Sequence, residues 1–492
     1  MGRVSVLEFQ AKTHYNLVNG DFIPATGGEI LEIYSPVDGS LVGAVPAMTR
    51  EDIDEAARGC KQAQGPWQRM PVYKRADLLY RAADLLEQQA EELAAVLTME
   101  IAKDKKSSLS EVIRSADLLR YTADVSKNSR GEAVFGDNFP GGSRNKMSFV
   151  ARVPMGTVLA VSPFNYPVNL SVSKIAPALM GGNTVLLKPA TQGAASALML
   201  AKILDKAGLP KGVLNTITGK GSVIGDYAVT HRDVDFINFT GSTQVGEHIS
   251  QICAMKPMIL ELGGKDAAIV LEDADLNFAA DNIVEGAYSY SGQRCTAVKR
   301  ILVVEPVADQ LIEKLKTRIG RLRWGDPREE GVAITPLINK EAADAAQRLI
   351  DDALEKGAML IVGNEREGNL LTPTLIDHVD TDMDLAWIEP FAPVLPILRV
   401  KNAAQAVEIA NRSEYGLQSS VFTNDINRAF AIASRLEVGT VQINNKTERG
   451  PDNFPFLGVK NSGMGTQGVK YSIEAMTRPK AVTINLRGGS FS

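Results

Sequence analysis

Residues 157–443 repeat one pattern that sharply limits the possible folds: short apolar runs alternate with segments of helical periodicity. Runs such as TVLAVS, NTVLLKPA and DFINFTG are typical of buried strands, whereas VSKIAPALMGG and AASALMLAKILDKAG have apolar residues at helical spacing. Strands that alternate with helices predict a parallel, doubly wound sheet. A second series begins at AAIVLED, residue 267, so we predict two α/β domains in tandem.

The segments around this pattern have a different character. Residues 51–126 have apolar residues three and four positions apart, which predicts helices. The stretch GDNFPGGSRNKM, residues 136–147, is rich in Gly, Asn and Pro and predicts an exposed loop or the tip of a β-arm. The tail TRPKAVTINLRGG predicts a terminal strand that pairs with this excursion or with another subunit.

Charge and cysteine content argue against several classes of function. The net charge of −5 and the 23% of charged residues do not favour binding to nucleic acid or to an acidic membrane. Three cysteines without a Cys-x-x-Cys pair indicate a reducing compartment. Without an apolar run long enough for a signal peptide or a membrane span, the chain is expected in the cytoplasm. The histidines lack the spacing of metal ligands; they are His14, His231, His248 and His378.

Polar residues directly after the predicted strands are the candidates for ligand binding, because open α/β sheets bind ligands beyond the carboxyl ends of their strands. PFNYP, KPAT, TGSTQVG and ELGGK all stand in such places. Gly241 and Ser242 open a predicted helix, whose N-terminus suits a phosphate but equally a simple N-cap. The segment GKGSVIG, residues 219–225, does not have the spacing of the dinucleotide-binding fingerprint.

Cys295 lies in the polar, glycine-containing stretch SGQRCTAVKR, directly after Arg294. A nearby cation and free backbone N–H groups are expected to lower its pKa and to favour a nucleophilic thiolate. A structural thiol is an equal alternative on this local context alone. Cys60 and Cys253 lie on helical patterns and are expected to be small buried apolar residues.

Glu261 ends a predicted strand and precedes Gly-Gly-Lys. It could form an ion pair with Lys265, or it could serve as the base that activates a water molecule opposite a cysteine thioester. Its local sequence does not decide between the two.

The motifs PFNYP, LLKPATQG, FTGSTQVG, LELGGKD, SGQRCT and EPFAPV follow one another in an order that resembles the aldehyde dehydrogenase superfamily over nearly the whole chain. SPFNYPVNLSVSKIAPAL, SGQRCTAVKR and the region from INNKTERG to MTRPK resemble a narrower family. These are the NADP-dependent, non-phosphorylating glyceraldehyde-3-phosphate dehydrogenases, which oxidise the aldehyde directly to 3-phosphoglycerate.

The resemblance implies a role for each of three residues in catalysis. Cys295 would be the nucleophile that forms a thiohemiacetal and then a thioester, and Glu261 would be the base for hydrolysis by water. The Asn165 side chain and the Cys295 backbone N–H would stabilise the oxyanion. A non-catalytic member of the fold is the alternative from another class, and the presence of both Cys295 and Glu261 argues against it.

The resemblance also implies a site for NADP. Lys188 and Thr191 would bind the adenosine ribose, Gly241 and Ser242 the pyrophosphate, and Glu389 with Phe391 the nicotinamide end. NAD-preferring relatives commonly have Glu at the position of Thr191, where a carboxylate would repel a 2′-phosphate. The neutral Thr191 therefore favours NADP. The chain departs from the usual motif at Ala392, which replaces a glycine near the nicotinamide.

For the substrate phosphate, the resemblance implies three arginines and one hydroxyl, because bidentate arginine contacts suit a dianionic group. These residues are Arg114, Tyr166, Arg294 and Arg449. The same arginines could instead bind the carboxylate of another anionic aldehyde, such as succinate semialdehyde.

By the same resemblance, the subunit would have three parts and would form a homotetramer, or a dimer of related design. Residues 1–127 and 149–260 would form a Rossmann-like cofactor-binding domain, and residues 261–455 the catalytic domain. Residues 128–148 and 456–492 would form a small β oligomerisation element.

Overall fold

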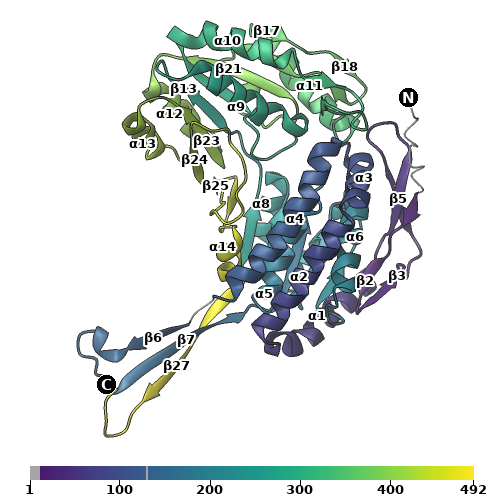
Figure 1. Ribbon diagram of the computed structural model, residues 1–492, viewed down its shortest axis with the longest axis vertical. Helices are drawn as coiled ribbons and strands as arrows, with labels where there is room; N and C mark the ends of the chain where they lie inside the picture. Colours follow the sequence, from purple (N-terminus) through teal and green to yellow (C-terminus); the bar gives the residue numbers. More distant parts are fainter. Residues whose placement is uncertain (1–10, 129–130, 492) are drawn as a thin grey trace.

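The computed structural model describes residues 11–128 and 131–491, and Figure 1 shows two α/β bodies and a projecting arm. The expected lack of a signal peptide concerns residues 1–10, which lie outside the described residues. So do residues 129, 130 and 492 of the expected oligomerisation element. Within the described chain, none of the helices combines the length and the apolar character needed to cross a bilayer.

The first body is built on a six-stranded sheet with the order β10-β9-β8-β11-β12-β26. Its strands are β8 (Thr157–Ser162), β9 (Thr184–Pro189), β10 (Leu214–Thr216), β11 (Phe236–Thr240), β12 (Met258–Glu261) and β26 (Gly463–Met464). All neighbours pair in parallel except β26, which is antiparallel to β12. The chain order reverses between β8 and β11, and doubly wound sheets bind ligands at such a switch point.

Helices cover both faces of this sheet. The crossover helices are α5 (Asn169–Met180), α6 (Ala194–Lys206), α7 (Gly221–Thr230) and α8 (Thr243–Ile252). The predicted N-terminal helices are present as α1 (Arg50–Arg69), α2 (Val72–Gln88), α3 (Ala90–Ile101) and α4 (Lys105–Ser126). Figure 1 shows α2 and α4 side by side, and α4 also packs on α5.

The second body is built on a seven-stranded sheet with the order β17-β20-β21-β14-β13-β23-β24. Its strands are β13 (Ala267–Val270), β14 (Arg300–Val304), β17 (Met359–Val362), β20 (Thr374–Asp377), β21 (Val394–Val400), β23 (Gln418–Phe422) and β24 (Thr440–Ile443). Its helices are α9 (Leu276–Tyr288), α10 (Glu305–Ile319), α11 (Lys340–Glu355), α12 (Ala403–Asn411) and α13 (Ile426–Ala433). The prediction of two parallel-sheet domains is confirmed, apart from one antiparallel edge pair in each sheet, β12–β26 and β17–β20.

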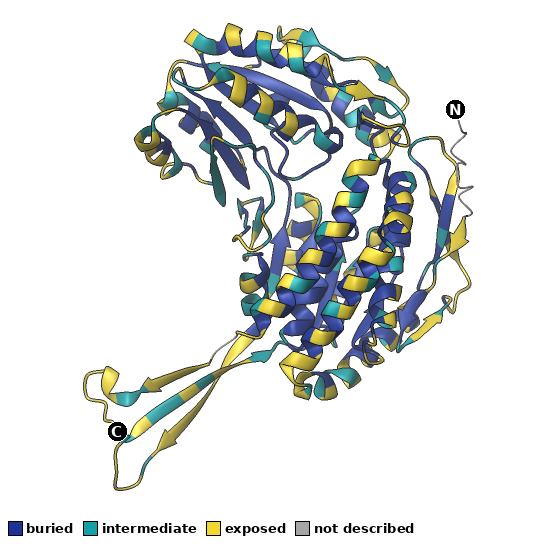
Figure 2. Cartoon of the chain, viewed as in Figure 1, coloured by how far each residue is buried: buried dark blue, intermediate teal, exposed yellow. Residues whose placement is uncertain are grey.

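The apolar runs became strands because they are buried on both faces. Every residue of β9, β11, β13 and β14 is buried, as expected for strands between two helical layers. Figure 2 shows both sheets as buried cores, while the helices expose their outer faces. Cys60 and Cys253 are also buried, as predicted for small apolar residues.

The arm consists of β6 (Glu132–Phe135), β7 (Lys146–Pro154) and β27 (Thr477–Asn485). β7 is the central strand, and β27 pairs with it antiparallel over nine residues. The prediction that the tail pairs with the excursion is therefore confirmed, and the excursion forms the tip of a β-arm. Figure 2 shows that most of the arm is exposed.

The structure corrects the extent assigned to residues 456–492. Within it, β25 (Val459–Lys460) pairs with β22 (Tyr415–Gly416) of the second body. The next strand, β26, joins the first sheet, and α14 (Val469–Ala475) packs on α4 and α5. Of the described residues 456–491, only those from Thr477 onward lie in the arm, because the preceding residues pair or pack with the two bodies.

Several short elements have no counterpart in the sequence prediction. At the N-terminus, β1 (Lys12–Thr13), β4 (Ile30–Tyr34) and β5 (Leu41–Pro46) form a sheet, beside the hairpin of β2 (Asn16–Val18) and β3 (Asp21–Ile23). The others lie in the second body: β15 (Arg323–Trp324), β16 (Val332–Ile334), β18 (Arg366–Glu367) and β19 (Leu370–Leu371). The described residues also contain three 3₁₀ turns: Gly136–Asn138, Ser289–Gly292 and Asp384–Ala386.

Candidate active site

The three residues expected to act in catalysis converge where the two bodies meet. Glu261 is the last residue of β12, and the Cys295 Sγ lies 4.0 Å from its Oε1. Asn165 follows β8, and its Nδ2 donates a hydrogen bond of 2.9 Å to the carbonyl of Gln293, two residues before the cysteine. The thiol, the carboxylate and the amide therefore lie within reach of a common substrate.

The backbone before Cys295 has an uncommon conformation. Tyr290 and Ser291 have φ angles of 51° and 52°, and Gly292 has 70°. Non-glycine residues rarely adopt this left-handed region, and a run of them persists only where the surroundings hold it. The Ser291 Oγ provides such a contact, because it accepts a hydrogen bond from the Thr335 N–H at 2.8 Å.

The structure corrects the expected pKa of Cys295. Burial is the largest cause and the charge of Glu261 the next; together they raise the pKa of this thiol to about 12. The positive charges of Lys299 and Arg449 lower the pKa and offset only part of this rise. The Arg294 guanidinium does not lower it, because this side chain turns away and donates to the Gly286 carbonyl. The thiol is therefore protonated at neutral pH, although the residue keeps a partly exposed surface.

Glu261 does not pair with Lys265. Its carboxylate accepts two hydrogen bonds from Arg449 Nη1, at 2.8 and 2.9 Å, and its side chain is only 3% exposed. Lys265 donates instead to the Ile388 carbonyl. Burial alone would raise the pKa of Glu261, but the charges of Arg449 and Lys174, with hydrogen bonds from Thr240 and Arg449, lower it. Glu261 is therefore a carboxylate that can accept a proton.

Behind Glu261 lies a hydrogen-bond chain that the sequence reasoning missed. Thr240 Oγ1 contacts Glu261 Oε2 at 2.9 Å and receives a hydrogen bond of 2.6 Å from Lys174 Nζ. Burial lowers the pKa of Lys174 to about 7, so this amine can gain or lose a proton near neutrality. No local pattern marks Lys174, which lies within the apolar helix α5.

Two of the four residues expected to bind the substrate phosphate lie together. Arg114 donates to the Arg449 carbonyl at 3.0 Å and to Asp452 at 2.8 Å. Arg449 also approaches Asp452, at 3.6 Å, and donates to Gln467 at 2.7 Å. Asp452 and Gln467 were not predicted, although both lie in a region that carried the resemblance.

Arg294 and Tyr166 are not joined to this cluster by hydrogen bonds or ion pairs within the described residues. Arg294 is 9% exposed, and its buried Nε lacks a hydrogen-bond partner in the described part of the chain. Tyr166 lies edge-on to Tyr290, with ring centroids 6.0 Å apart.

The residues expected to bind the adenosine half of a dinucleotide lie around the switch point. Lys188, in β9, is buried without an ion-pair partner among the described residues, and burial lowers its pKa to about 8. Thr191 follows this strand. Gly241 follows β11, and Ser242 is the N-cap of α8, where its hydroxyl accepts from the Val245 N–H. A cation without a carboxylate partner and the N-terminus of a helix both suit phosphate groups.

Glu389 is connected to Cys295 through Lys299, and Phe391 lies beside Phe164. Glu389 forms a 2.9 Å ion pair with Lys299, whose Nζ also donates to the Cys295 carbonyl. Phe391 packs edge-on against Phe164. Lys299 therefore links the cysteine to Glu389, a link that the spacing in the sequence does not reveal. Ala392, which departs from the usual motif, is buried, and its carbonyl lies against Gly292.

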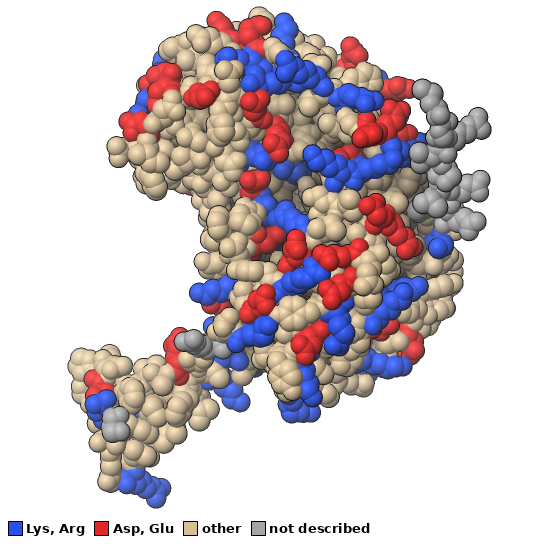
Figure 3. All heavy atoms as spheres, viewed as in Figure 1, with Lys and Arg blue, Asp and Glu red and all other residues tan. Residues whose placement is uncertain are grey.

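Two further observations concern the charge of the surface and the absence of a metal site within the described residues. Figure 3 shows acidic and basic side chains intermixed over the visible face of the described residues. No group of three or more His, Cys, Asp or Glu side chains within residues 11–128 and 131–491 is arranged to hold a metal ion.

Comparisons with known proteins identify the family to which the chain belongs. The model of the "Aldehyde dehydrogenase family" matches residues 22–482. An "NADP-dependent glyceraldehyde-3-phosphate dehydrogenase" of Streptococcus equinus is 55% identical over 96% of this chain and 99% of that protein. An enzyme of the same name from Triticum aestivum is 46% identical over 99% of this chain and 98% of its own.

A solved structure is similar over the same extent. The NADP-dependent glyceraldehyde-3-phosphate dehydrogenase of Bacillus halodurans C-125, complexed with NADP, has a TM-score of 0.95 and 52% sequence identity. The alignment covers 96% of this chain and all of the other. Since the family model spans most of the sequence and these relatives align with it almost from end to end, the chain belongs to the aldehyde dehydrogenase family.

Proposed function

We propose that this enzyme oxidises D-glyceraldehyde 3-phosphate to 3-phosphoglycerate with NADP, without using inorganic phosphate. The observation that carries the proposal is the convergence of Cys295 and Glu261 with a pair of arginines, Arg114 and Arg449. The names of the relatives point to the same substrate and cofactor. Both the substrate and the product are glycolytic intermediates, which would connect the enzyme to glycolysis.

The chain's own residues suffice for the chemistry at the carbonyl group. The Cys295 thiol first releases its proton to solvent water; the thiolate then attacks the aldehyde carbon, and the resulting oxyanion is stabilised by the Cys295 backbone N–H and the Asn165 amide. The amide has two N–H donors, and only one of them is used in the bond to Gln293. When bound, NADP accepts a hydride from the substrate carbon.

Glu261 then serves the hydrolysis of the thioester that remains on Cys295. Its carboxylate takes a proton from a water molecule, and the hydroxide formed attacks the acyl carbon, so that 3-phosphoglycerate leaves and the thiol is restored. The lowered pKa of Glu261 keeps it ready as a base. Thr240 and Lys174 offer a route by which the proton leaves Glu261.

The residues at the switch point fit NADP. Lys188 is a buried ammonium group whose pKa is lowered by burial alone, which indicates that no nearby carboxylate compensates its charge. The neutral Thr191 leaves this charge available for a 2′-phosphate. We assign the pyrophosphate to Gly241 and Ser242 at the start of α8, and the nicotinamide end to Glu389 and Phe391.

We assign the substrate phosphate to Arg114, Tyr166, Arg294 and Arg449. The guanidinium group of Arg449 already contacts Glu261, Gln467 and Asp452. A guanidinium group has five N–H donors, so these contacts leave at least one donor of Arg449 for a phosphate. The unpartnered Nε of Arg294 is a second donor for the same group.

We also propose that the subunits form a homotetramer in the cytoplasm through the arm. Its strands and tip expose the apolar residues Val134, Phe139, Phe149, Val482 and Ile484. Exposed apolar surface of this kind is typical of subunit contacts. The three free cysteines suit a reducing compartment. Light scattering of the wild type and of a Phe149→Glu variant tests the assembly; an unchanged mass would count against the arm as the contact.

The decisive experiment measures NADPH formation from D-glyceraldehyde 3-phosphate and NADP in a buffer without phosphate. We expect turnover by the wild type and none by Cys295→Ala. In Glu261→Gln, we expect one rapid equivalent of NADPH per subunit followed by slow turnover, because the thioester accumulates. Succinate semialdehyde serves as the comparison substrate, and preferential oxidation of that aldehyde by the wild type would refute the assignment.

A further inference from the structure

A buried ion pair that the mechanism above does not use lies beneath the catalytic loops. Lys103, between α3 and α4, contacts Glu111 of α4, and both side chains are 0% exposed. A buried ion pair contributes little net stability compared with apolar residues of the same size, because both charges lose their hydration. The stability of the fold therefore does not explain why the pair is there.

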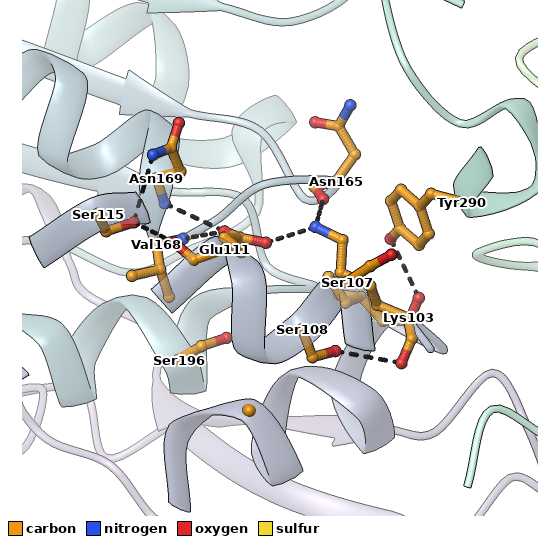
Figure 4. Close-up of polar contacts among 12 residues, drawn as sticks. Lys103, Ser107, Ser108, Glu111, Ser115, Asn165, Val168, Asn169, Ser196 and Tyr290 are labelled. Atoms are coloured by element: carbon orange, nitrogen blue, oxygen red, sulfur yellow. Dashed lines mark hydrogen bonds and ion pairs between the residues drawn. The ribbon is translucent and has the colours of Figure 1, made fainter. Parts of the chain in front are cut away.

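The pair holds both ends of the loop that carries Asn165. Figure 4 shows Lys103 Nζ directed at the Asn165 carbonyl, to which it donates at 2.8 Å. The second oxygen of Glu111 accepts from the backbone N–H groups of Val168 and Asn169, at 2.9 and 3.1 Å. One ion pair thus fixes the start and the end of residues 165–169.

Lys103 also contacts the segment that leads to Cys295. Its ammonium group lies 3.5 Å from the ring centroid of Tyr166 and 4.6 Å from that of Tyr290, within the range of cation–π contacts. The Tyr290 hydroxyl donates to the Ile101 carbonyl, two residues before Lys103. Tyr290 begins the left-handed backbone that precedes Cys295, so a single ammonium group touches both loops.

We propose that Lys103 and Glu111 are positioning residues that set the distance between the Asn165 amide and Cys295. The two halves of the oxyanion site come from different bodies of the molecule, and donors stabilise an oxyanion only when they are held in place beforehand. The ion pair provides a common support for both. This inference rests on the proposed function only in assigning the oxyanion to Asn165 and Cys295.

The test uses hydrolysis of 4-nitrophenyl acetate, which needs neither NADP nor a phosphorylated aldehyde. The Cys295 sulfur attacks the acetyl carbon, 4-nitrophenolate leaves, and water cleaves the acetyl thioester to acetate and the free thiol. The oxyanion is the same as in aldehyde oxidation. Failure of the wild type to oxidise glyceraldehyde 3-phosphate would therefore refute the substrate assignment without affecting this test.

The informative variant is the double substitution Lys103→Met with Glu111→Gln. Either single substitution leaves an unpaired buried charge and should lower the Tm, whereas the double variant removes both charges and should recover most of it. We expect its kcat for the ester to stay about 10- to 100-fold below that of the wild type, a smaller loss than that of a whole oxyanion donor. Recovery of kcat together with the Tm would overturn the proposal.

A second measurement asks whether the pair acts through Asn165. In the Asn165→Ala background, we expect the double substitution to lower kcat less than about threefold, because residues that act as one unit are not additive. If the double substitution lowered kcat as much in the Asn165→Ala background as in the wild type, the pair would act elsewhere than through Asn165.

Arg75→Met is the matched control. Arg75 is a buried cation that donates to the Leu179 carbonyl, at the opposite end of α5 from Asn169. It should lower the Tm and leave the ester kcat within about twofold of the wild type, as expected for a cation that only stabilises the fold. A fall in kcat equal to that of the double variant would refute a specific role for Lys103.

Discussion

The raised pKa of Cys295 predicts that its thiol reacts unusually slowly with iodoacetamide in the protein without ligands. Only the thiolate is alkylated, so the rate follows the thiolate fraction. The structure raises the pKa from 9.0 to about 12 through burial and the charge of Glu261. At 1.36 kcal/mol per pKa unit, this corresponds to about 4 kcal/mol against the thiolate.

The expected size and pH dependence of the effect follow from that shift. At pH 8, a thiol with a pKa of 9.0 is about one tenth ionised, whereas Cys295 would be ionised to about one part in ten thousand. Alkylation should therefore be about a thousandfold slower than that of an exposed cysteine of similar nucleophilicity. Because the group gains charge on losing its proton, the rate should rise about tenfold per pH unit from pH 7 to pH 10, without a plateau.

Mass spectrometry of the peptide that contains Cys295 measures this rate separately from those of Cys60 and Cys253. The matched variant is Glu261→Gln, which removes the neighbouring negative charge and nearly preserves the shape. We expect it to react at least about tenfold faster at pH 8, since a unit charge about 4 Å away interacts strongly even at a moderate effective dielectric constant. A plateau in the wild-type profile below pH 9 would refute the reasoning, because it would mean that burial does not control this thiol.

Three further substitutions test other parts of the site. Thr191→Glu should lower kcat/KM for NADP at least about a hundredfold relative to NAD, because the carboxylate repels the 2′-phosphate. The control Thr191→Ser should keep the preference for NADP. Steady-state kinetics with both cofactors would disprove the assignment if Thr191→Glu left the ratio of the two kcat/KM values unchanged. Gly292→Ala places a Cβ 2.3 Å from the Ala392 carbonyl oxygen. The control is Gly28→Ala, because Gly28 has a similar φ but a Cβ there would have no neighbour within 4 Å. Thermal unfolding should show that Gly292→Ala lowers the free energy of unfolding by about 1–3 kcal/mol more than Gly28→Ala. Asn165→Ala should lower kcat about 10²- to 10³-fold with little change in KM for NADP, and a loss below tenfold would remove Asn165 from the oxyanion site.

The alternation of strands and helices was predictable because its physical cause is local. A parallel strand between two helical layers is buried on both faces, so it reads as an apolar run, as in β9 and β11. Strands such as β25 and β26 are two residues long and carry no such signal. β26 exists because it pairs with Leu260 and Glu261, some two hundred residues earlier in the chain. The division implied by the resemblance therefore kept residues 456–476 within the oligomerisation element, with no local signal against it.

The positions of the proposed catalytic residues were predictable for a related reason, and their contacts were not. Glu261 is the last residue of β12, and ligand sites of doubly wound sheets lie beyond the carboxyl ends of the strands. Arg294, however, adjoins Cys295 in the sequence and still turns away from it. Successive residues in a tight turn point in different directions, so adjacency along the chain does not fix which groups meet.

The pKa of Cys295 shows the same limit in energetic terms. On the sequence alone, an adjacent cation and free backbone N–H groups were expected to lower this pKa, but the two largest contributions come from burial and from Glu261, which is 34 residues away in the chain. Desolvation depends on all the atoms packed around the sulfur, and a carboxylate counts only once the fold has brought it near. Lys103 illustrates the complementary case, since its neighbours in the sequence are unremarkable while its contacts in space join two catalytic loops. A local motif therefore locates the reacting atoms, whereas the charge state and alignment of those atoms follow from contacts that only the folded chain creates.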